Sequence, residues 1–123
     1  MSIAIVCTGT ELLKGGCCNT DLHFAGAALA AAALPPVLEL SVGDHADELC
    51  FALSCALKAA DTVLVSGGLG PTSDDITLAT VARFFGAETE EVPELREKVR
   101  RCSSRRGGGI YPSRHRQYGP TSW

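Results

Sequence analysis

The sequence contains no hydrophobic run long enough to cross a bilayer. The alanine-rich stretch from Ala25 to Leu34 is far shorter than the about 20 apolar residues that a spanning helix needs. The apolar segment Ser2–Cys7 follows no basic residue and is too short for the hydrophobic core of a signal peptide. We therefore expect a cytoplasmic protein without a membrane partner.

The six cysteines lack the spacings of a metal-binding motif. No two of them form a C-x-x-C pair, and no second cluster lies at zinc-site spacing. We expect reduced, mostly buried thiols, because an unpaired cysteine packs as a small hydrophobic residue. His23 and His45 have no partner pattern for metal binding or catalysis either, so both are expected on the surface.

Acidic residues are absent from the last part of the chain. All 14 lie between Glu11 and Glu97, whereas six of the 11 basic residues follow residue 99. The acidic body argues against nucleic acid as the main partner. Residues 102–123 contain one aliphatic residue, Ile110, and show no helix or strand period. We therefore expect a disordered or frameshifted tail there, after a domain spanning residues 1–101.

The body of the sequence alternates short apolar runs with helical patterns. Such alternation predicts an α/β fold with a mixed, mostly parallel sheet flanked by helices. The expected strands cover residues 2–7, 37–42 and 62–65, with a loop at 11–18 and helices starting near Asn19, Asp44, Ile76 and Pro93. The three phenylalanines expected in the core are Phe51, Phe84 and Phe85.

The strongest local motif is a glycine-rich loop between the third strand and the next helix, Gly67 to Asp75. Glycines there allow close approach to a ligand, and the start of a helix favours phosphate. The loop has no lysine, so it is not a Walker motif, and Ser73 stands where a dinucleotide fingerprint needs its third glycine. The loop therefore predicts phosphate binding of another type.

The acidic residues of these loops have two interpretations. Mg²⁺ held by one or two carboxylates and by phosphate oxygens would reconcile an aspartate with a nearby phosphate. Asp75, together with Asp74 and Asp44, is then a candidate ligand set for a divalent metal ion. Alternatively, Asp74 and Asp75 stabilise the start of the following helix, and Asp44 caps another. The residue types alone leave both open, and Glu11 is likewise a ligand acceptor or a solvated loop acid.

Taken together, the loops form a pattern with a known counterpart. Its motifs are Gly9-Thr10-Glu11-Leu12-Leu13, Asn19-Thr20, Val42-Gly43-Asp44 and Gly67-Gly68-Leu69-Gly70-Pro71-Thr72, followed by Asp74-Asp75 and Thr77. From about Ile3 to Val99 their order and spacing resemble the N-terminal, molybdopterin-binding-type domain of the competence/damage-inducible protein A (CinA-like) family. The domains of molybdenum-cofactor biosynthesis resemble it more loosely.

The resemblance implies a site at the strand ends and a small-molecule partner, a nucleotide or pterin phosphate. It further implies metal-dependent hydrolysis of ADP-ribose-type pyrophosphates, with non-catalytic binding or an inactive fragment as the alternatives. Asp75 would then be the catalytic residue, and Asp44, Asp74 and Asp75 would bind the metal ion. The residues implied to bind substrate are Gly9, Glu11, Asn19, Gly67, Gly68, Gly70, Pro71, Thr72 and Thr77. The resemblance is also compatible with a homo-oligomer.

The chain also departs from the family pattern. The family continues with further strands and a second glycine loop that helps to close the site, and nothing here matches that segment. A separate C-terminal domain of the family deamidates nicotinamide mononucleotide, and this chain has no counterpart to it. We therefore expect a domain that is incomplete at its C-terminal side, and we do not expect deamidase activity.

Overall fold

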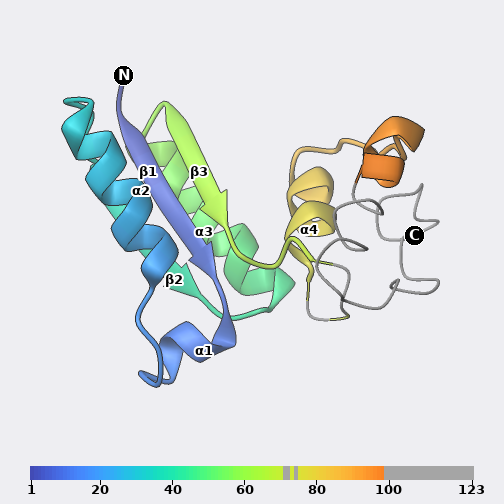
Figure 1. Cartoon of the computed structure of the whole chain (residues 1–123), viewed down its shortest axis with the longest axis horizontal. Helices are drawn as coiled ribbons and strands as arrows, with labels where there is room; N and C mark the ends of the chain where they lie inside the picture. The colour runs from blue at the N-terminus through green and yellow to red at the C-terminus, as the bar shows by residue number, and fades with distance from the viewer. Residues whose placement is uncertain (71–72, 74, 99–123) are drawn as a thin grey trace.

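The protein is seen here as a computed structural model that describes residues 1–70, 73 and 75–98 (Figure 1). Strands and helices alternate along the chain, as the sequence predicts. The elements are β1 (Ile3–Thr8), α1 (Thr10–Leu13), α2 (Thr20–Ala31), β2 (Leu38–Val42), α3 (Ala46–Ala59), β3 (Thr62–Ser66) and α4 (Thr77–Phe84). Residues 93–98 are also helical.

The three strands form one parallel sheet in the order β2-β1-β3. Ala4 on the central strand pairs with Leu38 on one side and with Val63 on the other. All six residues of β1 are buried, as expected for a continuous apolar run between two neighbours. The expected α/β class with a mostly parallel sheet is thus confirmed, and every described strand pair is parallel.

The main core lies between the sheet and α3. Leu49, Leu53 and Ala56 repeat at helical spacing and pack against Ala4 and Val6 of β1. Burying a leucine fully stabilises the fold by about 1.5–3 kcal/mol relative to leaving it exposed. This face therefore anchors the sheet, and it fixes the positions of the loops at the strand ends.

The opposite face of the sheet is covered by α2 (Figure 1). Asn19 caps this helix, since its Oδ1 accepts a hydrogen bond from the Leu22 N–H at 3.0 Å. None of its residues is buried, although the helix is rich in alanine and leucine, and Phe24 is 77% exposed. The helix was predicted correctly. It has no buried residue, whereas α3 has four.

Several local predictions were wrong. Residues 10–13 form the short helix α1 within the segment expected to be a loop. The phenylalanines Phe51 and Phe85 are 67% and 59% exposed, whereas Phe84 packs against the core. Phe51 lies on the outer side of α3, where helical spacing sends it away from Leu49 and Leu53.

Among the described residues, no helix is long and apolar enough to span a membrane.

Candidate functional site

The loops that follow β1 and β2 are tied together by backbone and side-chain hydrogen bonds. The Gly9 N–H donates to the Val42 carbonyl at 3.0 Å. The Thr10 N–H donates to Asp44 Oδ2 at 2.8 Å, and the Asp44 N–H donates back to Thr10 Oγ1 at 3.2 Å. Because parallel strands end on the same side of the sheet, these contacts make one connected edge.

Asp44 therefore has a structural role that differs from the predicted one. The first residue of α3 is preceded by His45, not by Asp44, and the His45 side chain makes no cap hydrogen bond. Glu48 in the first turn accepts a hydrogen bond from the Gly43 N–H through its Oε2 at 2.8 Å. Asp44 instead accepts from the N–H of the first residue of α1, a group without an intrahelical partner. The capping prediction was right in kind but wrong in the helix concerned.

Two glycines of the loop after β3 are required by its close packing. Gly67 has φ +95° and Gly68 has φ +59°, backbone conformations that side chains disfavour. A Cβ on Gly67 would overlap the Thr8 carbonyl oxygen and lie 2.9 Å from Thr8 Oγ1. A Cβ on Gly68 would overlap Thr77 Oγ1. The described contacts thus explain both glycines by the packing of the loop onto β1 and α4.

Thr77 connects the same loop to β1. Its Oγ1 donates to the Gly67 carbonyl at 2.8 Å and lies 3.2 Å from Thr8 Oγ1. Since a hydroxyl has one proton, Thr8 is the donor in the second bond. The Thr77 N–H donates to the Gly68 carbonyl at 3.1 Å, and the residue is 2% exposed. Thr77, predicted to bind substrate, is buried under the loop in this structure.

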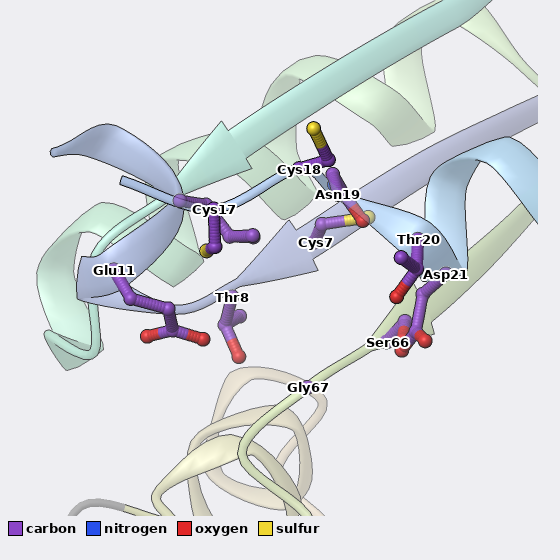
Figure 2. A pocket seen from close by; sticks show the side chains of 11 residues that line it. Cys7, Thr8, Glu11, Cys17, Cys18, Asn19, Thr20, Asp21, Ser66 and Gly67 are labelled. Carbon is purple, nitrogen blue, oxygen red and sulfur yellow. The ribbon is translucent and has the colours of Figure 1, made fainter. Parts of the chain in front are cut away.

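A cavity of about 310 Å³ opens between the ends of β1 and β3 and the start of α2 (Figure 2). It brings together Glu11, Asn19 and Gly67, three of the residues predicted to bind substrate from distant parts of the sequence. The other residues that line it are Cys7, Thr8, Leu12, Cys17, Cys18, Thr20, Asp21 and Ser66. Its volume is at the lower end of the range of about 300–1,000 Å³ that holds small molecules.

One side-chain nitrogen of a residue that lines this cavity is itself buried. Asn19 Nδ2 makes no hydrogen bond with any described residue, although Oδ1 of the same amide caps α2. Burial raises the pKa of the neighbouring Cys7 thiol, and the Asn19 side chain beside the sulfur opposes that shift. The carboxylates of Glu39 and Asp21 raise the Cys7 pKa further. A buried donor without a partner is costly unless a ligand or water satisfies it.

The cavity is acidic. Glu11 and Asp21 contribute carboxylates, and the described residues place no Lys, Arg or His in its lining. The Ser66 hydroxyl donates to Asp21 Oδ2, and Figure 2 shows these two side chains side by side.

Cys7 is buried as expected, but Cys17 and Cys18 are exposed, so the prediction of mostly buried thiols was wrong for this pair.

The remaining predicted residues lie beside the cavity or outside the described residues. Gly9 is buried and precedes α1, and Gly70 lies over Asp75, with 2.7 Å between a Cβ built on Gly70 and Asp75 Oδ2. Pro71, Thr72 and Asp74 fall outside the described residues. Residues 1–70, 73 and 75–98 contain no group of three or more Asp, Glu, His or Cys side chains that is suited to a metal ion. The set of Asp44, Asp74 and Asp75 therefore stays a prediction.

Asp21 and Ser66 were missed by the sequence analysis. Each is an ordinary polar residue at the end of an element, and only the fold brings them together across 45 positions of the chain. The available signal was positional, since Ser66 ends the third apolar strand and Asp21 stands two residues after the helix cap. Both therefore lie at the edge where ligands of parallel sheets bind.

The chain is similar to known proteins over most of its length. A family model described as "Probable molybdopterin binding domain" matches residues 4–117. The chain belongs to this family. Its fold is shared with the CinA protein of Thermoplasma acidophilum, at a TM-score of 0.76 and 30% identity over 98% of this chain and 71% of that one. MoaB of Pyrococcus furiosus, a tungsten cofactor synthesizing protein, matches with a TM-score of 0.64 and 26% identity over 87% and 64% of the two chains.

Curated relatives agree with the family. A CinA-like protein of Trichormus variabilis is 37% identical over 117 residues, which are 95% of this chain and 28% of that protein. A CinA-like protein of Desulfovibrio desulfuricans is 45% identical over 100 residues, 81% of this chain and 24% of the relative. The chain thus spans about a quarter of the length of these relatives, and the predicted resemblance to CinA-like proteins is confirmed.

Proposed function

We propose that this domain binds a phosphorylated pterin or nucleotide at the carboxyl-terminal edge of its sheet. The observation that carries the proposal is the cavity of about 310 Å³, which unites Glu11, Asn19 and Gly67. The family description, a probable molybdopterin binding domain, points to the same class of ligand.

The two sides of the edge suit different parts of such a ligand. The acidic cavity suits an uncharged ring, and the loop from Gly67 to Gly70 leads away from it toward the start of α4. An anion is favoured near a helix N-terminus by its unpaired N–H groups and dipole. We therefore place the ring in the cavity and the phosphate toward the glycine loop and Asp75.

Metal-dependent hydrolysis of an ADP-ribose-type pyrophosphate is a second candidate, implied by the resemblance to CinA-like proteins. Its support in this chain is Asp75, a half-buried carboxylate beside Gly70 and just before α4. One or two carboxylates are enough for Mg²⁺ when phosphate oxygens complete its shell, so Asp75 fits such an ion. The ion would neutralise phosphate charge, while Asp75 would hold it and the glycine loop would orient the phosphate.

Binding is tested by calorimetry with the full 123-residue chain. Probes are a pterin phosphate and ADP-ribose, each with and without Mg²⁺. Glu11→Gln and Asn19→Ala should weaken ligand binding about tenfold or more, whereas Glu88→Gln, an exposed carboxylate beyond α4, should leave it unchanged. If neither probe binds the folded wild-type chain, the proposed function is wrong.

Hydrolysis is tested separately by product formation. Asp75→Asn should abolish Mg²⁺-dependent release of AMP from ADP-ribose while urea unfolding still shows a cooperative transition. Binding without any product in the wild-type chain would retain the binding function and reject the enzymatic one. Full turnover by Asp75→Asn would reject the role of Asp75.

A further inference from the structure

The sheet has an open edge at β3 in the described part of the chain. β3 pairs with β1 on one side only, and Figure 1 shows it at the border of the sheet. The Thr62 N–H donates to the Ser2 carbonyl, so the backbone groups of Thr62 and, two residues on, of Leu64 point toward β1. Because these groups alternate along a strand, the N–H and C=O groups of Val63 and Val65 point outward. They pair with nothing among the described residues.

The two edges of the sheet differ in how they are protected. Edge strands that stay unpaired commonly carry a charge, a proline or a bulge that blocks a further strand. β2, the other edge strand, carries the exposed carboxylate of Glu39. β3 reads Thr-Val-Leu-Val-Ser, without a charged residue, proline or glycine, and Leu64 at its centre is 42% exposed. The edge of β3 is therefore suited to pairing with another strand.

The sequence of β3 is complementary to itself. When two copies run in opposite directions, Thr62 lies opposite Ser66, Val63 lies opposite Val65, and Leu64 lies opposite itself. The outward N–H of Val63 then meets the C=O of Val65 in the second copy, and the outward N–H of Val65 meets the C=O of Val63. A two-fold axis at Leu64 thus satisfies all four outward groups of each strand, as a self-complementary interface requires.

The packing of β3 leaves its central side chain for such a partner. Val63 and Val65 pack against the core on the side of α3. Leu64 pairs with Ile5 and points to the opposite face, where it remains partly exposed. The element that follows β3 is α4, and it packs on α3. A second Leu64 at the axis would cover apolar surface that the described residues leave in water.

On these observations we propose that two copies of this chain associate by antiparallel pairing of their β3 strands, which joins their sheets into one. The two Leu64 residues form a non-hydrogen-bonded pair at the axis, with Cα atoms about 4.5 Å apart. One strand pair buries less than the about 1,200 Å² typical of a stable complex, so we expect a weak dimer with a Kd of about 10–100 μM. The proposal does not depend on the ligand of the cavity.

Sedimentation velocity of the full chain over a range of concentrations measures the dimer. Leu64→Lys places two like charges opposite each other at the axis, so it should raise the Kd about tenfold or more. Leu13→Lys is the matched control, because Leu13 is 56% exposed on α1, which lies beside β2 at the other edge. This control should leave the Kd unchanged. A cooperative urea transition shows that each variant is folded.

A disulfide tests the register of the two strands. Leu64→Cys in a chain that also carries Cys17→Ser and Cys18→Ser should form a covalent dimer with oxidised glutathione. The expected Cα separation of about 4.5 Å lies within the about 4.4–6.8 Å that a disulfide spans. Leu13→Cys in the same background should form no more dimer than the background chain itself.

Hydrogen exchange of the wild-type chain identifies the groups that pair. The N–H groups of Val63 and Val65 should exchange more slowly as the concentration of the chain rises. The Leu64 N–H, which points toward β1, should be protected at every concentration. This measurement needs no substitution, so it decides the question even where Leu64→Lys does not fold.

Three results would overturn the proposal. The first is a wild-type chain that sediments as a monomer throughout, and the second is a dimer that folded Leu64→Lys leaves intact. The third is protection of Val63 and Val65 that does not change with concentration, because another segment of the chain would then cover the edge. Binding of a pterin or nucleotide at the cavity is measured separately, so the proposed function stands or falls without this interface.

Discussion

Replacing Gly67 by alanine tests whether the glycine loop is shaped by its packing onto β1. The residue has φ +95°, and a Cβ there would overlap the Thr8 carbonyl oxygen and approach Thr8 Oγ1 to 2.9 Å. The carbonyl belongs to the backbone of a buried strand, so it cannot rotate away as a flexible side chain would. The loop must move, and its hydrogen bond with Thr77 Oγ1 must lengthen or break.

The expected cost has two parts. A side chain at positive φ costs roughly 1–2 kcal/mol, and forcing an extra carbon into a packed site costs typically about 1–3 kcal/mol. The free energy of unfolding should therefore fall by about 2–5 kcal/mol, a large share of the about 5–15 kcal/mol that stabilises a typical domain. With a urea slope of about 1–3 kcal/mol/M, the unfolding midpoint should fall by about 0.7 M or more.

Gly15 provides the matched control. It has φ +68°, yet no heavy atom lies within 4 Å of a Cβ placed there. Gly15→Ala should therefore lose only the conformational part, about 1–2 kcal/mol. Urea unfolding followed by far-UV circular dichroism measures both. If Gly67→Ala is no more destabilising than Gly15→Ala, the packing explanation of the loop is refuted.

Three further predictions follow from single contacts. Asp44→Ala should lower the free energy of unfolding in urea by about 1 kcal/mol, because the Thr10 N–H loses its acceptor. Asp44→Asn should retain most of the stability, and equal losses in the two variants would contradict the capping role. Iodoacetamide labelling of the folded chain, mapped by mass spectrometry, should spare Cys7, whose pKa burial raises, and modify the two exposed cysteines of the cavity; rapid labelling of Cys7 would be inconsistent with its burial. Hydrogen bonds from the Ser2 N–H and hydroxyl lower the pKa of Asp61 below its ordinary value of 3.8. The stabilisation by the Asp61 carboxylate is therefore present above about pH 3.8 and is lost as the pH falls through the lower pKa of the folded state. The difference in unfolding free energy between wild type and Asp61→Asn should shrink on acidification. A difference independent of pH would argue against this role of Asp61.

The site was only partly accessible to sequence reasoning. Glu11, Asn19 and Gly67 were identified through a family motif and do line one cavity. Thr77 belongs to the same motif, yet it is buried and bonded to the loop. A motif records which residues are needed at a site, but it does not separate those that touch a ligand from those that hold the loop.

Errors in the fold arose where local pattern and tertiary contact differ. The four residues of α1 are too few for a helical period to show, and their helix is capped by Asp44 from 34 positions away. Phe51 is apolar, so it was expected in the core, but the rotation of α3 is set by Leu49 and Leu53. The hydrophobicity of one residue predicts its burial less well than the face of the helix on which it lies.

The sequence by itself determined the α/β class, the three parallel strands and the edge at which polar loops gather. Those features depend on the periodicity of apolar residues over short segments and on the order of the elements along the chain. The tertiary structure alone decided which loop residues meet. It pairs Asp21 with Ser66, turns the Gly67 backbone onto Thr8 and leaves Asn19 Nδ2 buried without a described partner. Such contacts depend on how the elements pack in space, because the atoms involved are separated by tens of residues along the chain.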